Sequence, residues 1–149
     1  HQMGPIDDLI VIARRGRITM GKAIFGSFAG VKPMGDCNSD GYVTVLTKAK
    51  GIRKALDLTT EYVKRTAVDA ENCYAIVSHT DRAQYAELLA EKIRENVGFK
   101  KVFVSESFSG NATNIGTGMI GVYYFGEEVS PELEKEKAVM KMLYPKEEV

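Results

Sequence analysis

The residues best suited to chemistry in this sequence are a histidine and an aspartate separated by one residue. His79 and Asp81 follow the apolar run of residues 73–77, where an α/β protein often holds its ligand groups. An imidazole oriented by a nearby carboxylate can act as a general base on a small substrate. The alternative is structural, with Asp81 and Gln84 as a capping box for the next helix and His79 as a loop residue bonded to the backbone. The residues favour the structural alternative.

A second candidate is the glycine-rich loop of residues 110–118, which precedes an expected strand at residues 119–125. Successive backbone N–H groups in such a loop can bind an anion. It is not a P-loop, because no Gly-Lys-Ser/Thr follows it and the next element is a strand. The alternative is a surface loop whose glycines permit unusual backbone angles.

Metal chemistry has little support in the sequence. Outside residues 1–4 there is a single histidine, His79, and Cys37 and Cys73 lie far apart, so no cluster has metal-ligand spacing. Residues 36–41 match the start of a calcium loop, but Thr47 stands where the bidentate glutamate is required. A hairpin turn explains the same segment.

The composition indicates one domain with balanced charge. The 149 residues include 20 basic and 20 acidic ones, without a basic stripe, which argues against a nucleic-acid partner. No apolar run reaches the ~20 residues of a membrane span, and two cysteines fit a cytoplasmic protein. Residues 1–4 resemble a remnant of cloning, so we expect the domain to comprise residues 5–149.

Hydrophobic periodicity predicts the elements that position these residues. Amphipathic helices are expected at residues 52–65, 82–97 and after Ser130-Pro131, with a short helix or strand at residues 7–16. Strands are expected at residues 42–47, 73–77, 101–105 and 119–125. The second and third of these enclose a helix and should be parallel, and the continuous apolar run at 73–77 predicts a strand covered on both faces. The fold class is therefore α/β.

The most apolar segment lies at residues 19–30 and is expected to be a helix that ends before Pro33. A helix that is apolar all round is buried or covers something. Its three glycines would let a backbone or a hydrocarbon chain approach closely. The residues support two interpretations about equally, a helix packed in the core and a helix that forms the wall of an apolar cleft. If the cleft wall is exposed, we expect the chain to self-associate through it.

Several motifs, taken in order, resemble the DegV family of bacterial fatty-acid-binding proteins. They are DDL at residues 7–9, GRI at 16–18, VKP at 31–33, KGIRKA at 50–55, SHTD at 78–81 and GTGMIGV at 116–122. The resemblance runs from Asp7 to Gly126 and implies a mixed β-sheet with helices packed on it. It also implies that the chain is the carboxy-terminal domain of a protein whose amino-terminal α/β domain grips the fatty-acid carboxylate.

The resemblance further implies a binding protein without catalysis or cofactor. A long-chain fatty acid would lie in an interdomain cleft, and members linked to a fatty-acid kinase present the acid to a separate ATP-using subunit. We expect the acyl-chain wall to comprise Ile24, Phe25 and Phe28. Near the carboxylate end we expect Asn114, Gly116, Thr117 and Gly118. Arg17 and Lys50 are candidates for contact with a phosphate or a partner.

The sequence departs from the family pattern at several of these positions. Asn114 stands in place of a histidine, and Thr117 in place of the proline of a Gly-Pro-Gly. Lys50 and Ile52 replace the arginines of an Arg-Gly-Arg, and Arg15 replaces the first of two glycines. The alternatives to lipid binding are an enzyme that uses His79, Asp81 and the Asn114 loop, and a module that docks on another protein.

Overall fold

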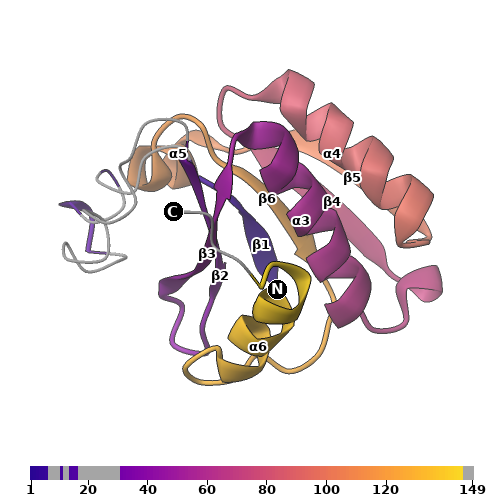
Figure 1. Ribbon diagram of the computed structural model, residues 1–149. Helices are drawn as coiled ribbons and strands as arrows, with labels where there is room; N and C mark the ends of the chain where they lie inside the picture. Colours follow the sequence, from indigo (N-terminus) through magenta and orange to yellow (C-terminus); the bar gives the residue numbers. More distant parts are fainter. Residues whose placement is uncertain (7–10, 12–13, 17–30, 146–149) are drawn as a thin grey trace.

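The computed structural model describes residues 1–6, 11, 14–16 and 31–145 (Figure 1). Its strands are β1 (Gln2–Pro5), β2 (Val31–Cys37), β3 (Val43–Lys50), β4 (Tyr74–His79), β5 (Lys101–Glu106) and β6 (Ile120–Tyr124). The helices of the described residues are α3 (Ile52–Thr66), α4 (Ala83–Asn96), α5 (Ser109–Ile115) and α6 (Glu134–Leu143), with a 3-10 turn at Ala70–Asn72.

The strands form one mixed sheet in the order β3-β2-β1-β6-β4-β5. β4 and β5 are parallel and are joined through α4, whereas the other neighbouring strands are antiparallel. The predicted α/β class and the predicted β4–α4–β5 unit are thereby confirmed. The carboxyl ends of β4 and β5 lie at one edge of the sheet, as parallel strands require.

β2 and β3 form the hairpin that residues 36–41 predict. Asn38 closes its turn, because the Oδ1 atom accepts the N–H groups of Asp40 at 3.1 Å and Tyr42 at 2.9 Å. Gly41 has a φ of 82°, a conformation that glycine adopts at little cost. These hydrogen bonds within the turn account for its backbone donors locally.

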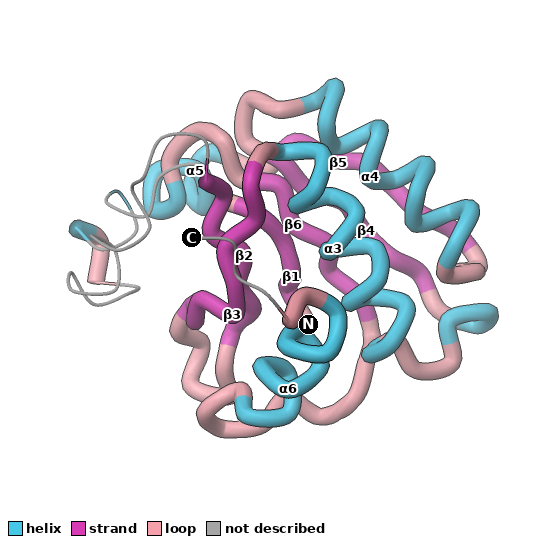
Figure 2. Tube along the Cα trace, in the orientation of Figure 1, coloured by secondary structure: helices cyan, strands magenta, loops and turns pink. Residues whose placement is uncertain are grey.

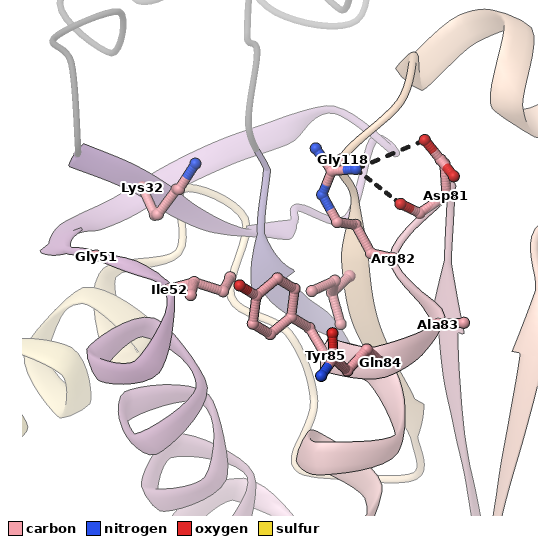
Figure 3. A pocket seen from close by; sticks show the side chains of 10 residues that line it. Lys32, Gly51, Ile52, Asp81, Arg82, Ala83, Gln84, Tyr85 and Gly118 are labelled. Atoms are coloured by element: carbon pink, nitrogen blue, oxygen red, sulfur yellow. Dashed lines mark hydrogen bonds and ion pairs between the residues drawn. The ribbon is translucent and has the colours of Figure 1, made fainter.

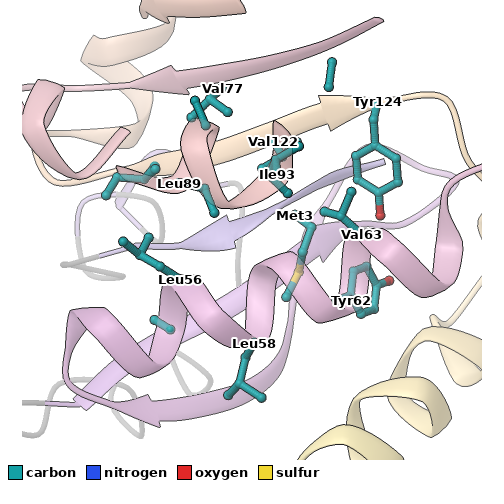
Figure 4. Close-up of a cluster of buried hydrophobic side chains, with 14 of the residues drawn as sticks. Met3, Leu56, Leu58, Tyr62, Val63, Val77, Leu89, Ile93, Val122 and Tyr124 are labelled. Atoms are coloured by element: carbon teal, nitrogen blue, oxygen red, sulfur yellow. The ribbon is translucent and has the colours of Figure 1, made fainter. Parts of the chain in front are cut away.

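α3 and α4 cover one face of the sheet (Figure 2). Their apolar stripes meet the central strands in the main core, where Leu56, Tyr62 and Val63 of α3 and Leu89 and Ile93 of α4 are fully buried (Figure 4). These are positions that the helical repeat of the sequence assigns to a buried face. Both predicted helices are confirmed.

The prediction that the domain begins at residue 5 is wrong, because β1 lies in the middle of the sheet. Its Met3 is fully buried in the main core. β1 pairs with β2 through Gly4 and Gly35, and with β6 through Gln2 and Tyr123. A segment of four residues that includes a glycine and a proline shows no alternation from which a strand could be predicted.

β4 is covered on one face and exposed on the other, contrary to the prediction from its apolar run. Tyr74 and Ile76 are 53% and 44% exposed, whereas Ala75 and Val77 are fully buried. Phe103 of β5 is also exposed, and its ring meets that of Tyr74 edge-on with centroids 5.9 Å apart. The outer face of β4 and β5 therefore presents apolar side chains to solvent.

The ends of three elements also differ from prediction. The region expected to be a loop contains α5, and α4 begins without the capping box of Asp81 and Gln84, because Asp81 adopts a left-handed φ of 55°. α6 begins at Glu134, and Ser130 instead donates its backbone N–H to Glu136 at 3.0 Å. Most of the helix or strand predicted at residues 7–16 lies outside the described residues. Of its described residues, Val11 and Arg14 are helical.

Candidate functional site

A small apolar cluster lies apart from the main core. Ile6 and Met119 are buried in it, and Val43, Val45 and Ile115 pack against them. None of these residues comes from α3 or α4, which cover the other face of the sheet. The cluster therefore marks a second hydrophobic surface of the sheet.

Glycines on three neighbouring strands line a cavity beside this cluster. They are Gly35 on β2, Gly4 on β1 and Gly121 on β6, and Gly4 pairs directly with Gly35. Met3 and Val122 point into the main core, so the alternation of side chains along β1 and β6 places Gly4 and Gly121 on the opposite face. We call this cavity, with its glycine floor and its walls of Ile6, Val43, Ile115 and Met119, the glycine groove.

Space in the glycine groove is limited. A Cβ atom on Gly4 would lie 1.9 Å from a carbonyl oxygen of β6, and one on Gly35 would lie 2.6 Å from a carbonyl oxygen of β3. A Cβ atom on Gly121 would instead make ordinary contacts, 3.4 Å from Met119 Sδ and 3.7 Å from Tyr123 Cε2. The cavity has a volume of about 50 Å³, well below the ~300 Å³ at which ligand pockets usually begin.

Two titratable side chains line the glycine groove without making it charged. Burial raises the pKa of the Cys37 thiol to about 11, and the negative charge of Asp36 adds to the effect. Burial also raises the pKa of the Tyr123 hydroxyl. Both groups are neutral at pH 7, so the groove remains suited to an apolar ligand.

Thr80 fastens the end of β4 to the loop before β6. Its N–H donates to the Met119 carbonyl at 3.0 Å, its hydroxyl oxygen accepts the Met119 N–H at 3.0 Å, and its carbonyl accepts the Gly118 N–H at 2.9 Å. The Gly116 N–H donates to the Ala112 carbonyl at 2.7 Å. Because these backbone N–H groups have partners, the loop does not offer them to an anion as the sequence suggested.

His79 has the structural role that the sequence favoured. It is 7% exposed, and its Nδ1 atom accepts the N–H of Arg82 at 3.2 Å. The Asp81 carboxylate is 81% exposed and lies 3.7 Å from the Arg82 guanidinium. The carboxylate faces Arg82 and the imidazole faces the backbone, so the arrangement gives no support to a general base oriented by Asp81.

Two larger cavities border Asp81. The first, of about 520 Å³, lies between the start of β2 and the starts of α3 and α4, and its lining includes Lys32 and Arg82 (Figure 3). The second, of about 370 Å³, is lined by Asp81, Glu106 and several hydroxyl groups. Cations and helix N-termini suit the first cavity to an anionic group, whereas two carboxylates disfavour an anion in the second.

The predicted carboxylate-end residues are divided between these cavities. Gly116 and Thr117 line the second cavity, and Gly118 lines the first. Asn114 lies on α5, where its side-chain amide donates to the Gly110 carbonyl at 2.9 Å. Contact of Asn114 or Thr117 with a ligand stays a prediction.

The remaining predicted residues are Lys50, the acyl-chain wall and Arg17. Lys50 is exposed at the end of β3 and precedes Gly51, which lines the first cavity. Ile24, Phe25, Phe28 and Arg17 lie outside the described residues. Sequence reasoning missed the pairing of Gly4 with Gly35, because that register joins two segments far apart in the chain.

The described residues contain neither a metal-binding cluster nor a helix of membrane-spanning length and apolarity. Within residues 1–6, 11, 14–16 and 31–145, no group of three or more His, Cys, Asp or Glu side chains is placed to hold a metal ion. In the same part of the chain, no helix is both long and apolar enough to cross a bilayer.

The fold and the site describe an α/β protein with an apolar groove on the sheet face that α3 and α4 leave uncovered. Residues 5–127 match the sequence model of the family described as "Uncharacterised protein, DegV family". The chain therefore belongs to the DegV family, as its motifs indicated.

Sequence relatives agree with this assignment. A DegV domain-containing protein of Clostridium perfringens is 29% identical over 126 residues, which are 85% of this chain and 43% of that protein. One from Caldanaerobacter subterraneus is 27% identical over 118 residues, 79% of this chain and 42% of that protein. The chain spans less than half the length of these relatives.

Solved structures share the fold. A fatty-acid-binding DegV family protein of Streptococcus agalactiae has a TM-score of 0.69 at 27% identity, over 81% of this chain and 42% of that one. The fatty acid kinase B3 protein of Streptococcus pneumoniae, loaded with linoleic acid, has a TM-score of 0.73 over 85% of this chain and 44% of that one. At 16% identity the latter supports the fold alone.

Proposed function

We propose that this chain contributes the apolar part of a long-chain fatty-acid site and has no catalytic activity of its own. The observation that carries the proposal is the glycine groove. Most of its wall side chains are aliphatic or thioether groups, with Gln2, Cys37 and Tyr123 as the polar part of the lining, and glycines on three strands leave the floor without side chains. Each methylene that leaves water for such a surface contributes about 0.8 kcal/mol.

Binding of a long chain requires the glycine groove to widen from its 50 Å³. Met119 is suited to this movement, because a methionine side chain is unbranched and fills irregular spaces. The predicted wall of Ile24, Phe25 and Phe28 would complete the covering of the acyl chain. Family membership and the fatty-acid-binding protein of Streptococcus agalactiae, 27% identical to this chain, support the choice of ligand.

The carboxylate end is proposed to lie in the first cavity, beside Gly118, because two carboxylates line the second cavity together with Thr117. Ile120 lines both the glycine groove and the first cavity, so an acyl chain in the groove could extend toward Lys32 and Arg82. Positive charge there would attract the carboxylate. A separate kinase subunit is proposed to act on the presented acid, with Arg17 and Lys50 as candidate contacts.

A titration with a fluorescent fatty acid tests the proposal, using the chain itself and a protein extended by the amino-terminal domain. Gly121→Leu projects a side chain into the groove and should weaken binding at least tenfold. Gly121→Ala is the matched control, because its Cβ atom fits at ordinary contact distances. Unchanged affinity in Gly121→Leu, with both variants folded by circular dichroism, would contradict the proposal.

A further inference from the structure

The imidazole of His1 lies between two hydrogen-bond acceptors. Its side chain is 1% exposed, with Nδ1 2.5 Å from an Asp36 carboxylate oxygen and Nε2 3.0 Å from the Glu127 carbonyl oxygen. A neutral imidazole carries a proton on only one nitrogen. Both contacts are therefore satisfied at once only by the imidazolium form.

Asp36 is held as a hydrogen-bond acceptor by its other neighbours. Oδ1 accepts the N–H groups of Gln2 and Cys37, each at 2.8 Å. Oδ2 faces His1 and accepts the hydroxyl of Tyr62 at 3.3 Å. Three donors other than His1 therefore engage this carboxyl group, which is fully buried, so it is placed as an acceptor toward the imidazole.

Aromatic rings and the local charges also favour the cation. The His1 ring stacks on Tyr124 with centroids 5.1 Å apart and meets Tyr62 edge-on at 6.1 Å. Burial by itself lowers the pKa of His1, but the hydrogen bond and charge of Asp36, with smaller contributions from the Glu127 carbonyl and from Glu136, raise it above 6.5. Burial raises the pKa of both tyrosines, which stay neutral.

We propose that the doubly donating imidazolium of His1 is a pH-sensitive clamp that holds β1 in the sheet. The clamp ties the start of β1 to β2 through Asp36 and to the segment after β6 through Glu127. β1 is only four residues long, and it carries Met3 of the main core and Gly4 of the glycine groove. Loss of the proton would set a nitrogen lone pair against an oxygen and leave the buried carboxylate without its counter-charge.

The sign of the pH dependence follows from the raised pKa of His1. The stabilisation is complete below pH 6.5, the unfolded value, and is lost as the pH rises through the folded value. One proton linked in this way changes the unfolding equilibrium constant up to about tenfold per pH unit between the two values. This inference does not depend on the proposed lipid function.

Urea unfolding from pH 6 to 9 tests the clamp in wild type, His1→Gln and His79→Gln. The charged groups around the ring are Asp36 and Glu136, and the His1 backbone nitrogen, which donates to the Tyr124 carbonyl at 3.2 Å, is retained in His1→Gln. We expect the unfolding constant to rise with pH in wild type and His79→Gln, and the His1→Gln profile to lack this rise. The same pH slope in His1→Gln as in wild type would overturn the proposal.

An NMR titration of the His1 ring in the wild-type protein gives a second measurement that needs no variant. We expect a midpoint above 6.5. Above that midpoint, the β1 amides should exchange hydrogen faster relative to the α4 amides than they do below it. A midpoint at or below 6.5 would overturn the clamp even if His1→Gln failed to fold.

Discussion

Asp36 accepts hydrogen bonds from β1, β2 and α3 while it is fully buried. Asp36→Ala would leave these donors without a partner and the His1 cation unpaired. We expect it to lower the free energy of unfolding at pH 6 by about 3–5 kcal/mol, the usual cost of breaking a buried ion pair. Urea unfolding would measure the change.

The matched control is Asp40→Ala in the exposed turn of the β2–β3 hairpin. Its effect should stay within about 0.5 kcal/mol of zero. Equal effects of the two substitutions would contradict the role assigned to Asp36.

The Cys37 thiol should react slowly at neutral pH, because burial and Asp36 raise its pKa to about 11 and the thiolate is the reactive form. In a Cys73→Ser variant, which leaves Cys37 as the single thiol, the alkylation rate should rise about tenfold per pH unit from pH 8 to 10. Mass spectrometry of iodoacetamide-treated protein would follow it. A rate that levels off below pH 9 would disprove the assigned environment.

At the scale of single residues, the sequence predicted the role of a side chain that bonds to nearby backbone better than it predicted contacts between distant segments. His79 was correctly favoured as a backbone-bonded residue because a polar side chain at a strand end meets nearby N–H groups. The glycine groove was not predictable in the same way. The floor of the groove depends on strand register. Tertiary contacts set both the register that pairs Gly4 with Gly35 and the register that places β6 beside β1.

Thr80 is the side chain that ties β4 to the loop before β6. Thr80→Val would remove the oxygen that accepts the Met119 N–H at 3.0 Å, and a buried N–H without a partner costs about 1–3 kcal/mol. We expect this loss in urea unfolding, together with faster hydrogen exchange at Met119. Thr80→Ser keeps the hydroxyl and should remain close to wild type, whereas a loss as large as that of valine would argue against the hydrogen bond.

At the scale of elements, prediction succeeded where a long stretch repeats one pattern. α3 and α4 each show a clear apolar stripe, so both were found from the sequence. β1 is too short for a pattern, and most residues of α5 are Ser, Gly, Asn or Thr, which favour loops over helices. β4 was correctly identified, but its apolar run did not reveal that one face is uncovered.

The uncovered face of β4 and β5 is the feature that concerns the whole molecule. Tyr74, Ile76 and Phe103 are exposed there, and parallel strands are usually covered on both faces. We propose that the amino-terminal domain implied by the family resemblance covers this face in the longer protein.

We expect Ile76→Lys to change the stability of the longer protein more than that of this chain. In this chain the side chain is 44% exposed, so the free energy of unfolding should change by about 0.5 kcal/mol or less. In the two-domain protein the lysine would be buried at the interface, and thermal unfolding should shift to lower temperature. Equal effects in the two proteins would show that the amino-terminal domain does not cover this face.

The family itself was readable from the sequence because its motifs recur in a fixed order, and the match over residues 5–127 confirms it. The fatty-acid contacts were not readable to the same degree. The predicted wall of Ile24, Phe25 and Phe28 lies outside the described residues, and Asn114 engages the Gly110 carbonyl within α5. Motifs specify a family, whereas contacts depend on how distant segments pack.

The central claim is that a fatty-acid chain lies in the glycine groove, and a spin-labelled stearic acid tests it most directly. The nitroxide broadens methyl NMR signals near the bound chain. We expect saturable broadening of the methyl signals of Ile6, Val43, Ile115 and Met119, which line the groove. The signals of Leu56 and Ile93 in the main core should change little. Absence of broadening in the two-domain protein, or broadening centred on the main core, would contradict it.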